Sequence, residues 1–162
     1  MKRISKKNYS MKKRIYLDDV RTPIEKDQWV IVRSYDEFVE KINEIGLENI
    51  DMISLDHDLG DTAMAEWHRN VYHNYELNYD NITEKTGMDC AKWLVNYFYD
   101  VNPFWGDFSR DKKRTEEFLF PKVYTHSANP IGSANIMGYI NNFLMNEARI
   151  QDCVRVYIEH TV

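Results

Sequence analysis

The sequence predicts a single α/β domain built on a doubly wound, mostly parallel five-stranded sheet. Two observations carry this prediction. Short β-branched segments alternate with segments of helical periodicity along the 162 residues, which is the pattern of strands joined by crossover helices. Polar clusters rich in Asp, His and Ser directly follow three of the strand-like segments, where ligands bind in sheets of this type.

Five short segments have the composition expected of strands, and turn residues or helical patterns separate them. These are residues 13–17, 29–32, 52–55, 123–125 and 154–158. Only about a dozen residues separate the first two segments, which is too few for a full crossover helix. We therefore expect a loop in place of the first crossover helix.

Helical periodicity appears between these strands. Ser34 to Glu37 has the form of a capping box and opens a helix that Gly46 ends. A second helix begins at Thr86, and a third runs from Gly132 to about Ala148. A short helix is predicted around residues 63–75.

Composition limits the organisation of the chain and its partners. We predict a basic N-terminal tail at residues 1–11 and one domain at 12–162, with inserts at about 61–85 and 101–120. Residues 1–14 hold seven of the 21 basic side chains and no acid, so the remaining 148 residues carry 14 basic against 26 acidic side chains. A body this acidic is a poor partner for duplex DNA. We expect a soluble cytoplasmic protein that binds no membrane, since no apolar run approaches a membrane span and the start lacks a signal peptide.

The polar clusters should meet in space, because a 2-1-3-4-5 strand order makes the first, third and fourth strands neighbours. The clusters are Asp18 and Asp19, then Asp56 to Asp58, then His126, Ser127 and Asn129. Four carboxylates in one crevice require a compensating cation, and oxygen-rich sites suit Mg²⁺, Mn²⁺ or Ca²⁺, of which we expect Mg²⁺ or Mn²⁺. Ser127 and Asn129 precede a predicted helix N-terminus, which favours phosphate binding, and Arg21 is placed to clamp the same phosphate.

Other chemically reactive residues receive a structural interpretation. We expect His68 and His73 to lie on the surface, and the aromatic residues of the first insert to pack onto the domain. Cys90 is predicted to be buried and inert. Asp89 either faces the site or caps its helix.

The residues named so far resemble the plan of response-regulator receiver domains. That resemblance implies that Asp18 and Asp19 hold Mg²⁺, that Asp56 accepts a phosphoryl group and that Ser127 contacts it. Receivers carry a Lys at the end of the fifth strand, but residues 154–162 contain none, and we expect no final receiver helix.

A closer resemblance is to the cyclic-phosphate processing receiver-like family. It rests on Leu17-Asp-Asp-Val-Arg-Thr-Pro23, Ser34-Tyr-Asp-Glu-Phe38, Ser54-Leu-Asp-His-Asp-Leu-Gly60, Thr86-Gly-Met-Asp-Cys-Ala-Lys-Trp-Leu94 and His126-Ser-Ala-Asn-Pro130. It covers roughly residues 13–60 and 86–145. It implies a receiver-like, flavodoxin-like fold that serves as a phosphoesterase in RNA-end repair or in phage–host conflict over nucleotide signals.

We therefore predict metal-dependent hydrolysis of a cyclic phosphate or a cyclic (oligo)nucleotide phosphodiester, with a small nucleotide or an RNA end as partner. The metal ligands would be Asp18, Asp19 and Asp56, the catalytic residues His126, His57 and Asp58, and the substrate-binding residues Arg21, Ser127 and Asn129. Two alternatives remain open: a non-catalytic degenerate receiver that binds a nucleotide or a protein, and a true phosphoacceptor at Asp56.

Overall fold

The computed structural model describes residues 11–101 and 120–161, and gives side chains as far as residue 146. Most of the predicted N-terminal tail and most of the second insert lie outside the described residues. Among the described residues, no helix combines the length and the apolar character needed to cross a membrane.

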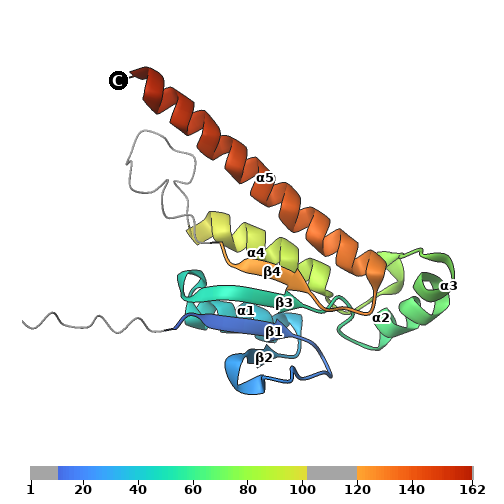
Figure 1. The fold of residues 1–162 in the computed structure, drawn as a ribbon. Coiled ribbons are helices and arrows are strands. Elements are labelled where there is room, and N and C mark those ends of the chain that lie inside the picture. Colours follow the sequence, from blue (N-terminus) through green and yellow to red (C-terminus); the bar gives the residue numbers. More distant parts are fainter. Residues whose placement is uncertain (1–10, 102–119, 162) are drawn as a thin grey trace, which may run out of the picture.

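Four parallel strands form one sheet in the order β2-β1-β3-β4 (Figure 1). Their bounds are β1 Lys13–Leu17, β2 Val30–Val32, β3 Ile50–Leu55 and β4 Lys122–Thr125. The order and direction confirm the predicted α/β class. Between β1 and β2 the chain forms a loop with one 3-10 turn, Lys26–Gln28, which confirms that the first crossover lacks a full helix.

Three long helices follow the strands: α1 Tyr35–Ile45 after β2, α4 Gly87–Val101 before β4, and α5 Pro130–Thr161 after β4. The Ser34 hydroxyl caps α1 by accepting a bond from the Glu37 amide, as the capping box predicts. The Glu37 carboxylate accepts from the Arg33 amide, one residue earlier than in a standard box. Gly46 ends α1 with φ of 85°, a conformation that favours glycine.

The fifth strand predicted at residues 154–158 is wrong, because α5 continues through this segment to Thr161. The alternating Val-Arg-Val-Tyr-Ile sequence suits a strand. However, the chain contains neither Gly nor Pro between Ala148 and Thr161, so nothing in it interrupts the helix. The described sheet therefore has four strands.

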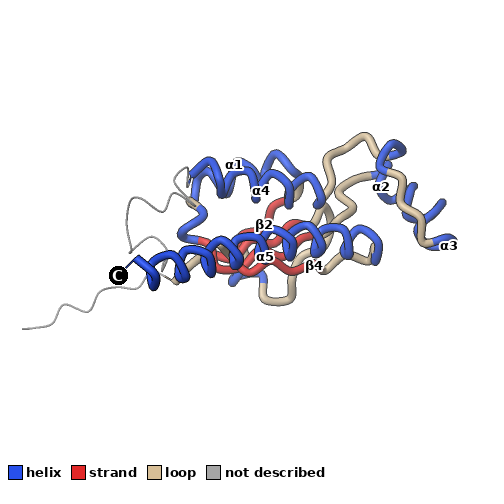
Figure 2. Tube along the Cα trace, turned by 90° about the horizontal axis from the view of Figure 1, so that it is seen from above, coloured by secondary structure: helices blue, strands red, loops and turns tan. Residues whose placement is uncertain are grey.

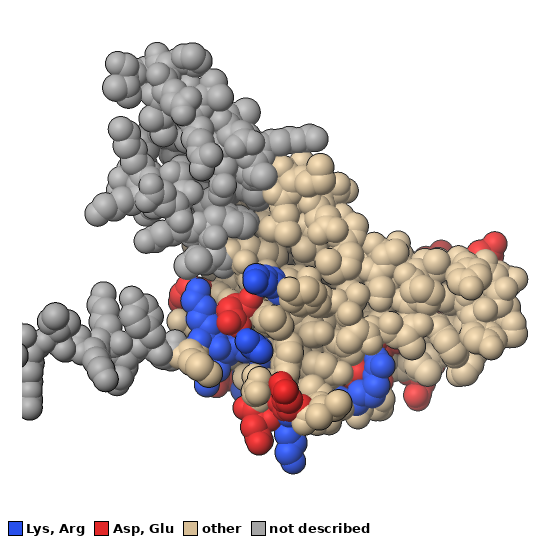
Figure 3. All heavy atoms as spheres, in the orientation of Figure 1, with Lys and Arg blue, Asp and Glu red and all other residues tan. Residues whose placement is uncertain are grey.

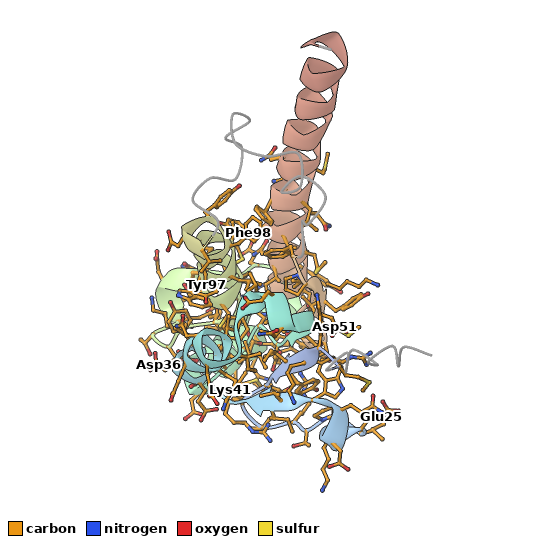
Figure 4. The ribbon with its side chains drawn as sticks, turned by 90° about the vertical axis from the view of Figure 1, so that its left-hand side faces the viewer. Glu25, Asp36, Lys41, Asp51, Tyr97 and Phe98 are labelled. Carbon is orange, nitrogen blue, oxygen red and sulfur yellow. The ribbon has the colours of Figure 1, made fainter. Side chains whose placement is uncertain are left out.

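Helices α1 and α4 cover one face of the sheet, and α5 lies along its β4 edge (Figure 2). Steps from β2 to β3 and from β3 to β4 run in the same direction along the sheet, so right-handed crossovers place α1 and α4 on the same side (Figure 2). Helix α5 packs on α4 and β4. Phe98 of α4, labelled in Figure 4, lies against Phe143 of α5 with ring centroids 5.5 Å apart.

Within residues 11–101 and 120–161, no long helix covers the second face of the sheet (Figure 2), whereas a doubly wound sheet carries helices on both faces. The first crossover would cover the second face, and here it is a loop; Glu25 in that loop lies at the margin of the molecule in Figure 4. Tyr16, Ile31 and Met52 on this face are only half-buried, and Tyr124 is 48% exposed. Figure 3 shows side chains of both charge signs close together around β1 and β2.

The first insert folds onto the end of the sheet at which β1 and β3 finish. It contains α2 Asp61–Glu66, a π-helical turn Trp67–Val71, α3 Tyr72–Asn74 and a 3-10 turn Tyr79–Asn81, so the helix predicted near 63–75 is confirmed. Glu66 organises it: this buried carboxylate accepts bonds from the Asn70 and Asn81 side-chain amides and from the Asn78 backbone amide.

Candidate active site

The carboxyl ends of three adjacent strands carry the predicted site residues. β1, β3 and β4 are neighbours, and their last residues are in register. The Asp56 amide donates to the Leu17 carbonyl at 2.9 Å, and the His126 amide donates to the Leu55 carbonyl at 3.1 Å, which extends both ladders by one residue. Asp18, Asp56 and His126 therefore leave the sheet side by side, as the strand order predicts.

Three carboxylates form a cluster at this edge. Asp18, Asp19 and Asp56 each offer an oxygen, and these three oxygens lie within 4.8 Å of one another. Asp18 is fully buried and Asp56 is 5% exposed, whereas Asp19 is partly open to solvent. The cluster thus combines hard oxygen ligands with limited access to water.

Arg21 bridges two of these carboxylates. Its Nε donates to Asp18 Oδ2 at 2.7 Å, and its Nη2 lies 3.3 Å from Asp56 Oδ2. The same Nη2 donates to the His126 carbonyl at 3.3 Å. The guanidinium therefore joins the ends of all three strands.

His126 completes the bridge through its ring. Nε2 lies 3.1 Å from Asp18 Oδ2, and Nδ1 lies 2.7 Å from Ser54 Oγ. Burial lowers the pKa of His126, although its bond to Asp18 opposes this shift. A neutral ring donates Nε2–H to Asp18 and accepts the Ser54 hydroxyl at Nδ1, and Tyr16 stacks on it with centroids 4.1 Å apart.

The three carboxyl groups differ in acidity. Burial raises the pKa of Asp56, against a hydrogen bond from the Ser127 hydroxyl and the charge of Arg21. Burial also raises the pKa of Asp19, and the charges of Asp56 and Asp18 add to the effect. Burial alone would raise the pKa of Asp18, but backbone and guanidinium bonds from Arg21 lower it overall. A divalent cation would favour the charged form of all three groups.

His57 and Asp58 lie in a second, buried network rather than in the acidic cluster. The fully buried His57 ring places Nδ1 2.6 Å from Asp58 Oδ1 and Nε2 3.0 Å from the Tyr79 hydroxyl. Only the backbone amide of His57 reaches the cluster, where it donates to Asp56 Oδ1 at 2.8 Å. The network thus holds the Asp56 carboxylate in place through the His57 amide and connects it to Tyr79 of the first insert.

Asn129 belongs to the same network and caps α5. Its Oδ1 accepts from the Gly132 amide at 2.9 Å, and its Nδ2 donates to Asp58 Oδ1 at 3.2 Å. Asn135, one helical turn beyond Gly132, donates to the Tyr79 hydroxyl at 3.2 Å. Asn129 therefore joins the helix start to the His57 network, and its role in phosphate binding stays a prediction.

The other histidine, cysteine and aspartate predictions have clear outcomes. His68 and His73 are exposed, and Cys90 is fully buried with a raised pKa, all as predicted. Asp89 caps α4: its Oδ2 accepts bonds from the Thr86 amide and hydroxyl. The capping alternative for Asp89 is therefore confirmed.

Sequence reasoning missed two residues that shape the site. The strand pattern assigns Ser54 only to a strand. A hydroxyl inside a buried strand requires a hydrogen-bond partner, and in the structure this partner is His126. Arg33 donates to the Asp18 carbonyl at 3.0 Å and to the Arg21 carbonyl at 2.5 Å. No local pattern predicted this long-range role for Arg33.

Comparison with known proteins places the chain in a family. The sequence model of the cyclic-phosphate processing receiver domain matches residues 13–142, which include every element from β1 into α5 and every residue of the site. Neither a curated protein nor a solved structure matches the chain.

Proposed function

Because the chain belongs to the cyclic-phosphate processing receiver domain family, we propose that it hydrolyses a cyclic phosphate or a cyclic nucleotide phosphodiester with the help of a divalent metal. One observation carries the proposal. Three carboxylates, a guanidinium, an imidazole and a hydroxyl converge where β1, β3 and β4 end.

The donor set fits a hard divalent cation. Asp18, Asp19 and Asp56 supply only carboxylate oxygens, which suit Mg²⁺ or Mn²⁺ better than a thiophilic ion. Burial raises the pKa of Asp56 and of Asp19, and the neighbouring carboxylates add to the effect, so a bound cation would favour the charged form of both groups. A cation bound there would polarise a phosphoryl oxygen as a Lewis acid.

The residues around the cluster supply complementary functions. Arg21 can bind a phosphate through paired N–H groups, and the Ser127 hydroxyl can donate to another phosphate oxygen. The His126 ring, held by Tyr16 and Ser54, presents Nε2–H toward the cluster for hydrogen bonding to the leaving oxygen.

We assign His57 and Asp58 to positioning rather than to proton transfer, and this revises the catalytic roles predicted from the sequence. Both side chains bond to Tyr79 or Asn129 in the buried network, whereas the His57 amide fixes Asp56 Oδ1. They would keep the Asp56 carboxylate in a fixed position relative to the ends of the strands.

A non-catalytic phosphate-binding module is the second candidate. The supporting observation is that the groups of the site already bond to one another: Arg21 pairs with both Asp18 and Asp56, and both ring nitrogens of His126 are bonded. A site of this kind could capture a nucleotide and release it intact.

A turnover screen separates the two functions. The full chain would be incubated with Mg²⁺ or Mn²⁺ and with RNA ending in a 2′,3′-cyclic phosphate, cyclic mono- and dinucleotides, and larger cyclic oligonucleotides. We expect cleavage of one class, abolished by EDTA and by Asp56→Asn, and reduced by about 10²-fold or more in His126→Gln. A compound that is retained without cleavage would replace the esterase by the binding module.

A further inference from the structure

Arg21 contacts two of the three carboxylates that would hold a divalent cation. Its Nε and Nη2 contact Oδ2 of Asp18 and Oδ2 of Asp56, at 2.7 and 3.3 Å. A cation bound to both carboxylates would lie about 2.0–2.6 Å from the same oxygens. The guanidinium and the metal therefore compete for the space between two strand ends.

The hydrogen bonds of Asp18 leave no unused oxygen for the metal. Oδ1 accepts from the Val20 amide at 3.0 Å and the Arg21 amide at 2.6 Å. Oδ2 accepts from Arg21 Nε and is bonded to His126 Nε2. Since the amide bonds belong to the loop backbone, the Arg21 side chain is the partner that can leave most easily.

The surrounding structure allows that side chain to move while its backbone stays fixed. Arg33 holds the loop by donating to the carbonyls of Asp18 and Arg21 and to the Thr22 hydroxyl. The Arg21 side chain is itself 47% exposed, so it is in contact with solvent. A rotation of the side chain would carry the guanidinium outward, toward the space above the carboxylates where a phosphate must approach.

We propose that Arg21 is an exchangeable counter-cation, which pairs with Asp18 and Asp56 in the metal-free protein and moves onto the phosphate when a divalent cation binds. The inference rests on the metal site of the proposed function. It adds an order of events and a coupling: the metal binds first, and its binding creates the anion site. The two ligands therefore bind cooperatively, because each favours the outward position of Arg21.

Side-chain NMR of the full chain tests the movement directly. The Arg21 Nε–H signal, assigned by its loss in Arg21→Gln, is expected to shift toward those of exposed arginines when Mg²⁺ is added, and to exchange faster with water. The Arg33 signal serves as the control and should stay in place. An Arg21 signal that remains protected at saturating Mg²⁺ would overturn the proposal.

Binding measurements test the competition and the coupling. Arg21→Gln should bind Mn²⁺ about ten-fold more tightly than the wild type, measured by EPR of free Mn²⁺, because a competing positive charge is gone. The control Lys41→Gln removes a cation that pairs with Glu44 on α1, outside the acidic cluster, and should leave Mn²⁺ binding unchanged. Weaker Mn²⁺ binding in Arg21→Gln would mean that Arg21 orders the carboxylates, which contradicts the proposal.

Inorganic phosphate is the probe for the anion site. In the wild type, Mg²⁺ should tighten phosphate binding about ten-fold, followed by ³¹P NMR, and Arg21→Gln should lose this gain. An equal gain in both proteins would refute the coupling. None of these measurements needs turnover. Metal binding without hydrolysis would reject only the esterase function. Failure to bind Mn²⁺ would reject the displacement of Arg21 as well.

Discussion

Replacing Gly132 by alanine should destabilise the protein by breaking the His57 network. A Cβ on Gly132 would lie 2.3 Å from Cγ of the His57 ring and 2.7 Å from its Nδ1. Ordinary carbon contacts begin near 3.4 Å, so the ring must move by about 1 Å. The ring is fully buried and bonded to Asp58 and Tyr79, so it cannot move without losing a bond.

The expected magnitude follows from three contributions. Overpacking a buried contact costs about 1–3 kcal/mol. A buried ring nitrogen or carboxylate left without its partner costs about another 1–3 kcal/mol. Alanine has a better helix propensity than glycine, which offsets less than about 1 kcal/mol of this loss. We expect Gly132→Ala to lower the free energy of unfolding by about 3 kcal/mol.

Gly138 provides a matched control in the same helix. A Cβ there would meet nothing within 4 Å, so Gly138→Ala should raise the free energy of unfolding by about 0.5–1 kcal/mol. Urea unfolding followed by tryptophan fluorescence measures both variants. Because the substitution is identical, the gap of about 4 kcal/mol reports the contact of Gly132 with His57. Equal stabilities for the two variants would refute the close packing of the His57 ring under α5.

Three further predictions concern the same region and the first insert. Gly87→Ala places a Cβ 2.0 Å from the Asp56 carbonyl oxygen, so it should cost about 3 kcal/mol or more in a thermal melt and weaken Mn²⁺ binding; a stable variant with unchanged metal affinity would contradict this. Tyr79→Phe leaves His57 Nε2 without its partner and should cost about 1–3 kcal/mol in urea, while unchanged stability would show that water replaces the hydroxyl. Burial would raise the pKa of Glu66, but bonds from three N–H groups lower it overall. The ionised Glu66 therefore stabilises the folded protein above its ordinary pKa near 4.5, and this stabilisation disappears as pH falls through the folded pKa. Glu66→Gln should therefore cost about 1–3 kcal/mol at pH 7 and remove part of the acid-induced loss seen in the wild type between pH 5 and 3; parallel pH profiles would disprove this.

Local chemistry made most of the fold predictable. The Ser34 cap and the Gly46 stop define α1, and the β-branched segments mark the strands of the sheet. The C-terminal segment was mispredicted because Val-Arg-Val-Tyr-Ile suits both a strand and a helix, and the sequence alone does not show whether a sheet edge will accept it. The one-sided cover of the sheet follows from strand order, which individual segments do not reveal.

The site was predictable to the level of strand ends but not of side-chain direction. Asp56 and His57 are consecutive, yet one side chain enters the acidic cluster and the other enters the buried network. Sequence spacing grouped His57 with Asp58 and His126, because all follow strands. The direction of the His57 side chain depends on two residues that lie far along the chain. Gly132 leaves space for the ring, and the Tyr79 hydroxyl bonds to its Nε2.

The short loop between β1 and β2 also bears on how the protein folds. Twelve residues separate these strands, compared with 66 between β3 and β4. By loop-closure entropy the longer connection costs about 1.5 kcal/mol more to close. Pairing of β1 with β2 therefore loses less chain entropy than pairing of β3 with β4, so we expect β4 to join the sheet last. The carboxylates after β1 would then be in place early, and the histidine after β4 would join them last.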